Sequence, residues 1–213
     1  MKRSRVLLGD DHAIILDGLR RILEPHFEVV GTAQDGRALV AAAKELRPDV
    51  IVADISMPLL NGIEAARQLQ KEPSPPKIIF LTMHPDVTYT TEAFRAGASG
   101  YVLKNSAASE LVTAIQEVLK GRTYLTPLVA KDMLDNLLET PAQPEKQSLT
   151  LTSRQREILQ LVAEGRSTKD MAAILNISPR TVEFHKYRIM EALGLRTTAE
   201  LTQYAIKHGI VSP

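Results

Sequence analysis

The stretch VIVADISMP, residues 50–58, decides the fold of the first half of the chain. Four small apolar residues, 50–53, lead into a single carboxylate, Asp54. A short apolar run closed by turn residues is typical of a strand buried on both faces. Asp54 is therefore expected where a buried strand ends and a loop begins, which is the edge where open parallel sheets bind ligands.

The composition favours one or two folded domains without disulfides or a membrane span. The 213 residues are 44% hydrophobic and include no cysteine, which excludes a disulfide framework and a thiolate metal site. The basic start MKRSRVLL resembles that of a signal peptide, but Gly9, Asp10 and Asp11 interrupt its apolar run at once. No apolar run approaches the ~20 residues that cross a membrane. We expect a cytoplasmic protein with no membrane partner.

Short apolar runs alternate with helical patterns five times along residues 1–122. The expected strands are residues 6–8, 29–30, 50–53, 78–81 and 101–103, and the expected helices are residues 14–23, 38–46, 63–69, 87–94 and 111–119. This alternation predicts the α/β class, a doubly wound parallel sheet of five strands with helices on both faces.

The polar residues that follow these strands carry the functional information. They are Asp10, Asp11, Asp54, Thr82 and Lys104, each just past the carboxyl end of a strand. Since those ends share one edge of a doubly wound sheet, the five are expected to meet in one pocket. Taken singly, each has an ordinary alternative, such as a helix cap for the acidic pair or a surface position for the lysine. The occurrence of all five residues at the ends of strands favours a common functional site.

The chemistry of this set points to phosphoryl transfer. Three neighbouring carboxylates repel one another and favour a cation between them, and oxygen ligands without His or Cys suit Mg²⁺. A carboxylate beside Mg²⁺ can attack phosphorus and form an acyl phosphate. Lys104 can supply the countercharge, and the Thr82 hydroxyl can turn toward the phosphoryl group. No GxxxxGK[ST] loop is present, so nucleotide binding is unsupported.

Residues 1–122 closely resemble the receiver domain of two-component response regulators. The matching pieces are LLGDDH (7–12), VADISMPLLNG (52–62), FLTMH (80–84) and GYVLKN (100–105). The resemblance implies a flavodoxin-like fold with strand order 2-1-3-4-5. Many receivers follow the lysine of the last motif with proline, where this chain has Asn105. A cis peptide at that point would cost a non-proline residue about 3 kcal/mol.

The same resemblance implies a role for each pocket residue. Asp54 is the expected phosphoacceptor, and Lys104 is expected to pair with the phosphoryl group. Thr82 and Tyr101 form the expected switch pair. The implied Mg²⁺ ligands are Asp10, Asp11, Asp54 and the backbone carbonyl of Ser56.

Residues 123–147 read as a linker between two domains. Thr126-Pro127 opens a short helix that carries several leucines. The following TPAQPEKQ (140–147) is polar, contains two prolines and is typical of an extended tether. The predicted division is therefore a receiver at 1–122, a linker at 123–147 and a second domain at 148–213.

Residues 148–213 predict a small all-α domain of four helices, at about 153–164, 168–175, 179–193 and 198–208. Three helix starts have the capping-box pattern, a hydroxyl residue followed three positions later by an acid or amide. The pairs are Thr152 with Gln155, Ser167 with Asp170, and Thr197 with Glu200. Ser178-Pro179 provides the fourth start. The second and third helices have the look of a helix-turn-helix.

The third of these helices has an apolar stripe and an opposite face suited to DNA. Basic flanks can contact phosphates while the central side chains reach base edges, and the start of the second helix favours a phosphate. Residues 148–213 also carry nine Lys or Arg against six Asp or Glu. The ordinary alternative is a small bundle that binds a protein. The predicted DNA-contacting residues are Ser167, Thr168, Lys169, Arg180, Thr181, Glu183, Phe184, Lys186, Tyr187 and Arg188.

The segments LTSRQREILQLVAEGRSTKDMAAIL (151–175) and SPRTVEFHKYRIMEALGL (178–195) closely resemble the LuxR/NarL-type DNA-binding domain. The resemblance implies that residues 179–193 are the recognition helix and that the last helix helps dimerisation. Family members often carry a basic residue at the positions of Glu183 and Tyr187, and this chain does not.

Together the two halves resemble a response regulator of the NarL/FixJ family. The resemblance implies a DNA-binding transcriptional regulator, not an enzyme. Asp54 would accept a phosphoryl group from a sensor histidine kinase, and the chain would then bind double-stranded promoter DNA as a homodimer. Two alternatives stay open. One is a regulator whose receiver-like half serves dimerisation or ligand binding without phosphorylation. The other is a phosphatase-type enzyme with Asp54 as nucleophile, although such enzymes place an acid where this chain has Ser56.

Overall fold

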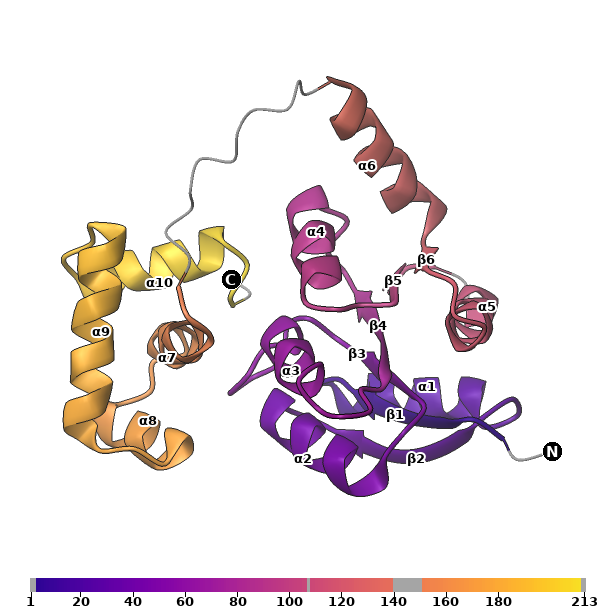
Figure 1. The fold of residues 1–213 in the computed structure, drawn as a ribbon, viewed down its shortest axis with the longest axis horizontal. Helices are drawn as coiled ribbons and strands as arrows, with labels where there is room; N and C mark the ends of the chain where they lie inside the picture. The colour runs from indigo at the N-terminus through magenta and orange to yellow at the C-terminus, as the bar shows by residue number, and fades with distance from the viewer. Residues whose placement is uncertain (1–2, 107, 140–150, 212–213) are drawn as a thin grey trace.

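The computed structural model describes residues 3–106, 108–139 and 151–211. Strands and helices alternate through the first part of the chain, and helices alone make up the last part (Figure 1). The two parts lie side by side. Helix α6 (Pro127–Glu139) comes between them in the sequence and extends away from the sheet.

The first part is one parallel sheet in the order β2-β1-β3-β4-β5-β6, counted over the described residues. The strands are β1 (Arg5–Gly9), β2 (Glu28–Ala33), β3 (Val50–Ala53), β4 (Lys77–Thr82), β5 (Gly100–Leu103) and β6 (Tyr124–Leu125). The predicted doubly wound order is confirmed, but the predicted number of five strands is too small by one. The sixth strand pairs with β5 and lies in the predicted linker. It has only two residues, which is too few to show the alternation of apolar and polar residues that marks a strand in the sequence.

Helices cover both faces of the sheet, as predicted. They are α1 (Ala13–Leu23), α2 (Gly36–Leu46), α3 (Gly62–Leu69), α4 (Val87–Arg95) and α5 (Ala108–Leu119). Alternate residues of a strand point to opposite faces, so Ile51 packs in the core with α2 and α3, and Val52 packs in the core with α1 and α5. All four β3 residues are buried, which explains the continuous apolar run before Asp54.

The last part is a small helical domain around one apolar cluster. Its helices are α7 (Ser153–Ala163), α8 (Thr168–Leu175), α9 (Pro179–Leu193) and α10 (Thr198–Lys207), within one residue of the predicted bounds. All three predicted capping boxes form, and the Ser178 side chain caps α9 with proline in its first turn. Val182 and Ile189 place the apolar stripe of α9 in the core.

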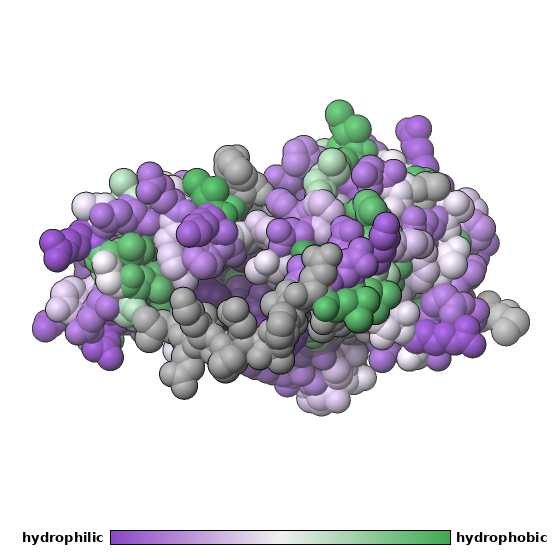
Figure 2. Space-filling view, turned by 90° about the horizontal axis from the view of Figure 1, so that it is seen from above, coloured by the Kyte–Doolittle hydropathy of each residue, from purple (hydrophilic) through white to green (hydrophobic). Residues whose placement is uncertain are grey.

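The described residues include no helix that is both long and apolar enough to cross a bilayer. The face seen in Figure 2 is mostly hydrophilic, and its apolar groups form separate small patches. No cis peptide bond occurs in the described part of the chain, and this includes the bond between Lys104 and Asn105.

Candidate functional site

The register of the sheet brings Asp10, Asp54 and Lys104 together. Gly9 pairs with Ala53, and the Asp54 amide donates to the Gly9 carbonyl at 2.8 Å, so the residues that follow β1 and β3 are neighbours. Lys104, just past β5, places its Nζ 2.7 Å from Asp54 Oδ2 and 2.6 Å from Asp10 Oδ2. Three of the five residues predicted to converge, Asp10, Asp54 and Lys104, are therefore in direct contact.

The charged side chains of this pocket are largely buried: Asp10 is 1% exposed and Asp54 is 6% exposed. Burial acts to lower the pKa of Lys104, but its hydrogen bonds to Asp10 and Asp54 act the other way and leave that pKa above its ordinary value. The ammonium is therefore charged at neutral pH and compensates two carboxylates. Removal of one member of such a buried group leaves the others uncompensated.

Asp11 adds a third carboxylate at the rim of the pocket. His12 Nδ1 lies 2.7 Å from Asp11 Oδ1 and 3.2 Å from Asp10 Oδ1, and one ligand atom from each of the three residues lies within 4.8 Å of the others. The ordinary reading of the acidic pair as a helix cap is wrong, because the residue at the N-cap of α1 is His12. The carboxylate oxygens of Asp10 and Asp11 fit a hard cation such as Mg²⁺, whereas Asp54 is not a member of this group and is linked to Asp10 through the shared Lys104 ammonium.

Thr82 and Tyr101, the predicted switch pair, both contact one residue that the sequence did not single out. Thr82 is fully buried at the end of β4, and its Oγ1 accepts from the His84 amide at 3.3 Å. The Tyr101 hydroxyl donates to the His84 carbonyl at 2.6 Å, and burial raises the pKa of Tyr101, so it stays a neutral donor. The His84 ring stacks on Tyr89 at 4.3 Å and lies 3.1 Å from Ser56 Oγ.

The predicted DNA-contacting residues lie at the start of α8 and along the outer face of α9. Phe184 and Tyr187 are 60% and 65% exposed. The Thr168 hydroxyl donates to the Glu183 carboxylate and so joins the two helices. The Ser167 side chain is occupied by the α8 cap. Lys169, Arg180 and Arg188 are exposed, and Thr181 and Lys186 are partly exposed.

Comparison with family models accounts for both parts of the chain. Residues 6–116 match the response regulator receiver domain. Residues 149–205 match the bacterial regulatory proteins of the LuxR family.

Named relatives and solved structures share this two-domain organisation. The transcriptional regulatory protein MctR of Rhizobium johnstonii is 38% identical over 99% of this chain and 96% of its own length. The response regulator UvrY of Escherichia coli is 35% identical over 96% of this chain and 94% of its own. The crystal structure of the response regulator ChrA of a heme-sensing two-component system covers 99% of this chain and 100% of that chain, at 33% identity and a TM-score of 0.54. Salmonella typhimurium RcsB covers 96% of this chain and 98% of that chain, at 27% identity and a TM-score of 0.60. The chain therefore belongs to the two-component response regulators that couple a receiver domain to a LuxR-type DNA-binding domain and regulate transcription.

Proposed function

We propose that Asp54 is the residue that accepts the phosphoryl group. The observation that carries this assignment is the buried pair between Asp54 and Lys104, because the amine already lies where a new negative charge would form. An Asp54 oxygen forms the new bond to phosphorus as the bond from phosphorus to a nitrogen of the kinase histidine breaks. A small phosphodonor such as acetyl phosphate can replace the kinase in the same step.

Asp10, Asp11, Asp54 and the carbonyl of Ser56 are the residues that would hold Mg²⁺. The bound ion would neutralise oxygens of the phosphoryl group during transfer. Asp10 and Asp54 are fixed relative to each other by the shared Lys104 ammonium, and Asp11 remains at the solvent side of the pocket.

The switch follows from the charge that phosphorylation adds. A phosphoryl group adds about −1.5 to −2 charge and strong acceptor oxygens. Lys104 pairs with these oxygens, and the Thr82 hydroxyl turns toward them. Thr82 then gives up its contact with the His84 amide, and the loop that Tyr101 also holds rearranges with α4.

A sensor histidine kinase and double-stranded promoter DNA are the proposed partners, and the phosphorylated chain is proposed to bind as a homodimer. Solved structures of the relative RcsB include a complex with DNA and two dimers bound to two parallel DNAs. Two recognition helices in a dimer would reach half-sites about one DNA turn, ~34 Å, apart. The exposed outer face of α9 supports this role.

The assignment is tested by phosphorylation with acetyl phosphate and Mg²⁺, followed on gels that retard phosphorylated chains. Asp54→Asn should abolish the retarded band. Asp35→Asn is the matched control, because Asp35 caps α2 outside the pocket and its variant should label normally. Labelling of the Asp54→Asn chain would show that another residue accepts the phosphoryl group.

A further inference from the structure

The outer face of α9 combines a carboxylate with two exposed aromatic side chains. Glu183, Phe184 and Tyr187 are exposed and lie on the side of the helix opposite Val182 and Ile189, which are buried in the core. Neighbouring apolar side chains that stay exposed on one face mark a surface that contacts another molecule. The chemistry of this face therefore indicates what that molecule presents to it.

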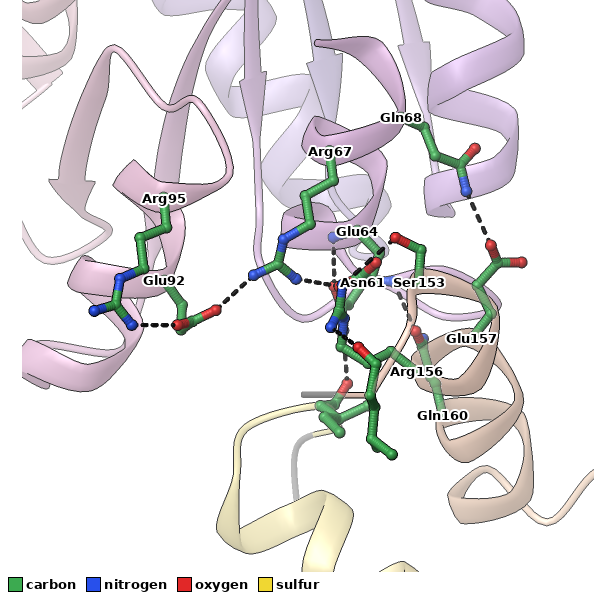
Figure 3. Close-up of polar contacts among 12 residues, drawn as sticks. Asn61, Glu64, Arg67, Gln68, Glu92, Arg95, Ser153, Arg156, Glu157 and Gln160 are labelled. Atoms are coloured by element: carbon green, nitrogen blue, oxygen red, sulfur yellow. Dashed lines mark hydrogen bonds and ion pairs between the residues drawn. The ribbon is translucent and has the colours of Figure 1, made fainter. Parts of the chain in front are cut away.

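The receiver does not cover this face. Gln160 of α7 bonds to backbone groups of Asn61 and Met57 in the loop after β3. Arg156 of the same helix pairs with Glu64 of α3, as Figure 3 shows. In Figure 1, α7 lies between α9 and the receiver, and α9 lies on the far side. The aromatic side chains of α9 are therefore available to a partner outside the chain.

The charges around the two aromatic rings favour DNA as that partner. Lys169 at the start of α8 and Arg180 and Arg188 on α9 are exposed, and Lys186 is partly exposed. The major groove of DNA admits one helix and places base edges between two rows of phosphates. An apolar centre with cationic flanks matches that arrangement.

Glu183 is the residue of this face that phosphates would repel. The Thr168 hydroxyl at the start of α8 donates to Glu183 Oε1 and so holds the carboxylate in place. A carboxylate has two oxygens with several acceptor positions, so Oε2 can accept from a second donor. A donor in the groove would offset the repulsion by the phosphates.

The donors of the major groove decide which base such a carboxylate can read. Cytosine presents its N4 amino group and adenine its N6 amino group, whereas the guanine and thymine edges carry acceptors. Adenine also carries the N7 acceptor beside its amino group, and this acceptor would face the carboxylate. Cytosine has no such acceptor, so cytosine is the base that fits Glu183.

Phe184 selects for a different group. It lies in the second turn of α9, and the first turns of a recognition helix are the ones that reach base edges. Its side chain has no polar atom, and the apolar group that base edges offer in the major groove is the C5-methyl of thymine. Burial of one methyl group corresponds to about a fourfold gain in affinity.

We propose that α9 reads a cytosine through Glu183 and the methyl group of a thymine through Phe184, so that each half-site contains both bases. Thr168 is a positioning residue, because it acts by holding the Glu183 carboxylate. The inference rests on the proposed function, in which the outer face of α9 enters the major groove.

Selection from a random duplex library by the full chain, with acetyl phosphate and Mg²⁺, tests the role of Glu183. The unchanged chain should require cytosine at one position of each half-site. Glu183→Ala should lower the discrimination at that position about tenfold and leave the other positions as they are. Glu191→Ala is the matched control, because it removes an equal charge near the end of the same helix, and it should keep the cytosine.

The opposing result is also defined. If Glu183→Ala binds every duplex more tightly with the cytosine preference unchanged, the carboxylate only repels phosphates and its assignment is overturned. An unchanged chain that selects no cytosine overturns it as well.

Two substitutions at Thr168 separate positioning from a general structural role. Thr168→Val should lower the cytosine discrimination about threefold without changing the affinity for an unrelated duplex. Thr168→Ser keeps the hydroxyl and should keep the discrimination. Full discrimination by Thr168→Val, or an equal loss of affinity for all duplexes, overturns the positioning role.

Deoxyuridine tests the role of Phe184, because it lacks the methyl group of thymine and keeps its base pairing. Replacement of the thymines of the selected duplex, one at a time, should reveal a position at which the unchanged chain binds about fourfold more weakly. Phe184→Ala should be insensitive to that replacement, and Phe184→Leu should keep part of the effect. The assignment is overturned if no position responds, or if Phe184→Ala responds as the unchanged chain does.

These outcomes distinguish the base contacts from the proposed function. A chain that binds duplex DNA without any base preference keeps its proposed function and overturns the base contacts. A chain that binds no duplex overturns both. Duplex binding that Glu183→Ala and Phe184→Ala both leave unchanged means that this face meets another partner, such as a protein, and overturns the inference alone.

Discussion

Replacement of Lys104 by methionine should destabilise the receiver domain by about 3 kcal/mol. The substitution keeps most of the side-chain volume and removes the charge that Asp10 and Asp54 share at 2.6 and 2.7 Å. Loss of one partner from a buried ionic group costs about 3–5 kcal/mol. The Lys104 side chain is 10% exposed, so we expect the lower end of that range.

The dependence on pH has a defined sign. The pKa of Lys104 in the folded chain lies above the ordinary value of 10.5. A group with a raised pKa stabilises the fold fully below its unfolded value, and this stabilisation is lost as the pH rises through the folded value. The difference between the two proteins should therefore be constant near neutral pH and, on the alkaline side, shrink above about pH 10.5 as Lys104 loses its proton.

Urea unfolding followed by circular dichroism measures this difference. Lys44→Met is the matched control, since Lys44 forms a surface pair with Glu72 at 2.9 Å and its loss should change stability by about 0.5 kcal/mol or less. Addition of Mg²⁺ should recover part of the stability of the Lys104→Met chain, because a cation at the acidic set restores charge compensation. A Lys104→Met chain within 1 kcal/mol of the unchanged protein would refute the buried-charge reasoning.

Two other substitutions and one measurement test the switch and the DNA surface. Tyr101→Phe removes the hydrogen bond to the His84 carbonyl, which should cost about 1 kcal/mol and speed amide exchange in residues 83–86. Residues 88–91, TYTT, are a poor helical run, so α4 should exchange faster than α5 in the unphosphorylated chain; equal protection of both helices would contradict this. Lys186→Ala should weaken DNA binding alike for all sequences and reduce the salt slope by about 1; a change in sequence preference would point to a base contact instead.

The pocket was predictable because strand geometry places it. Short apolar runs identify the strands, and the parallel order places the carboxyl ends of these strands at one edge of the sheet. The polar residue after each run is therefore expected at that edge. His84 was missed because its contacts run through a backbone amide and carbonyl, which any residue type supplies. The edge strand β6 was missed because two residues carry no alternation.

The interdomain contact left a signal in the sequence that periodicity alone does not reveal. In α7, residues 157–162 are all buried, and a helix that is buried all round normally carries only apolar side chains. Glu157 and Gln160 interrupt this run, and a polar group without water needs a partner. The DNA-binding domain itself supplies only some of these hydrogen-bond partners. The Gln160 side chain bonds instead to backbone groups of Asn61 and Met57, about one hundred positions earlier in the chain. Polar residues inside an otherwise apolar helix of a small domain therefore predict a surface that a second domain covers, even where its location stays unknown.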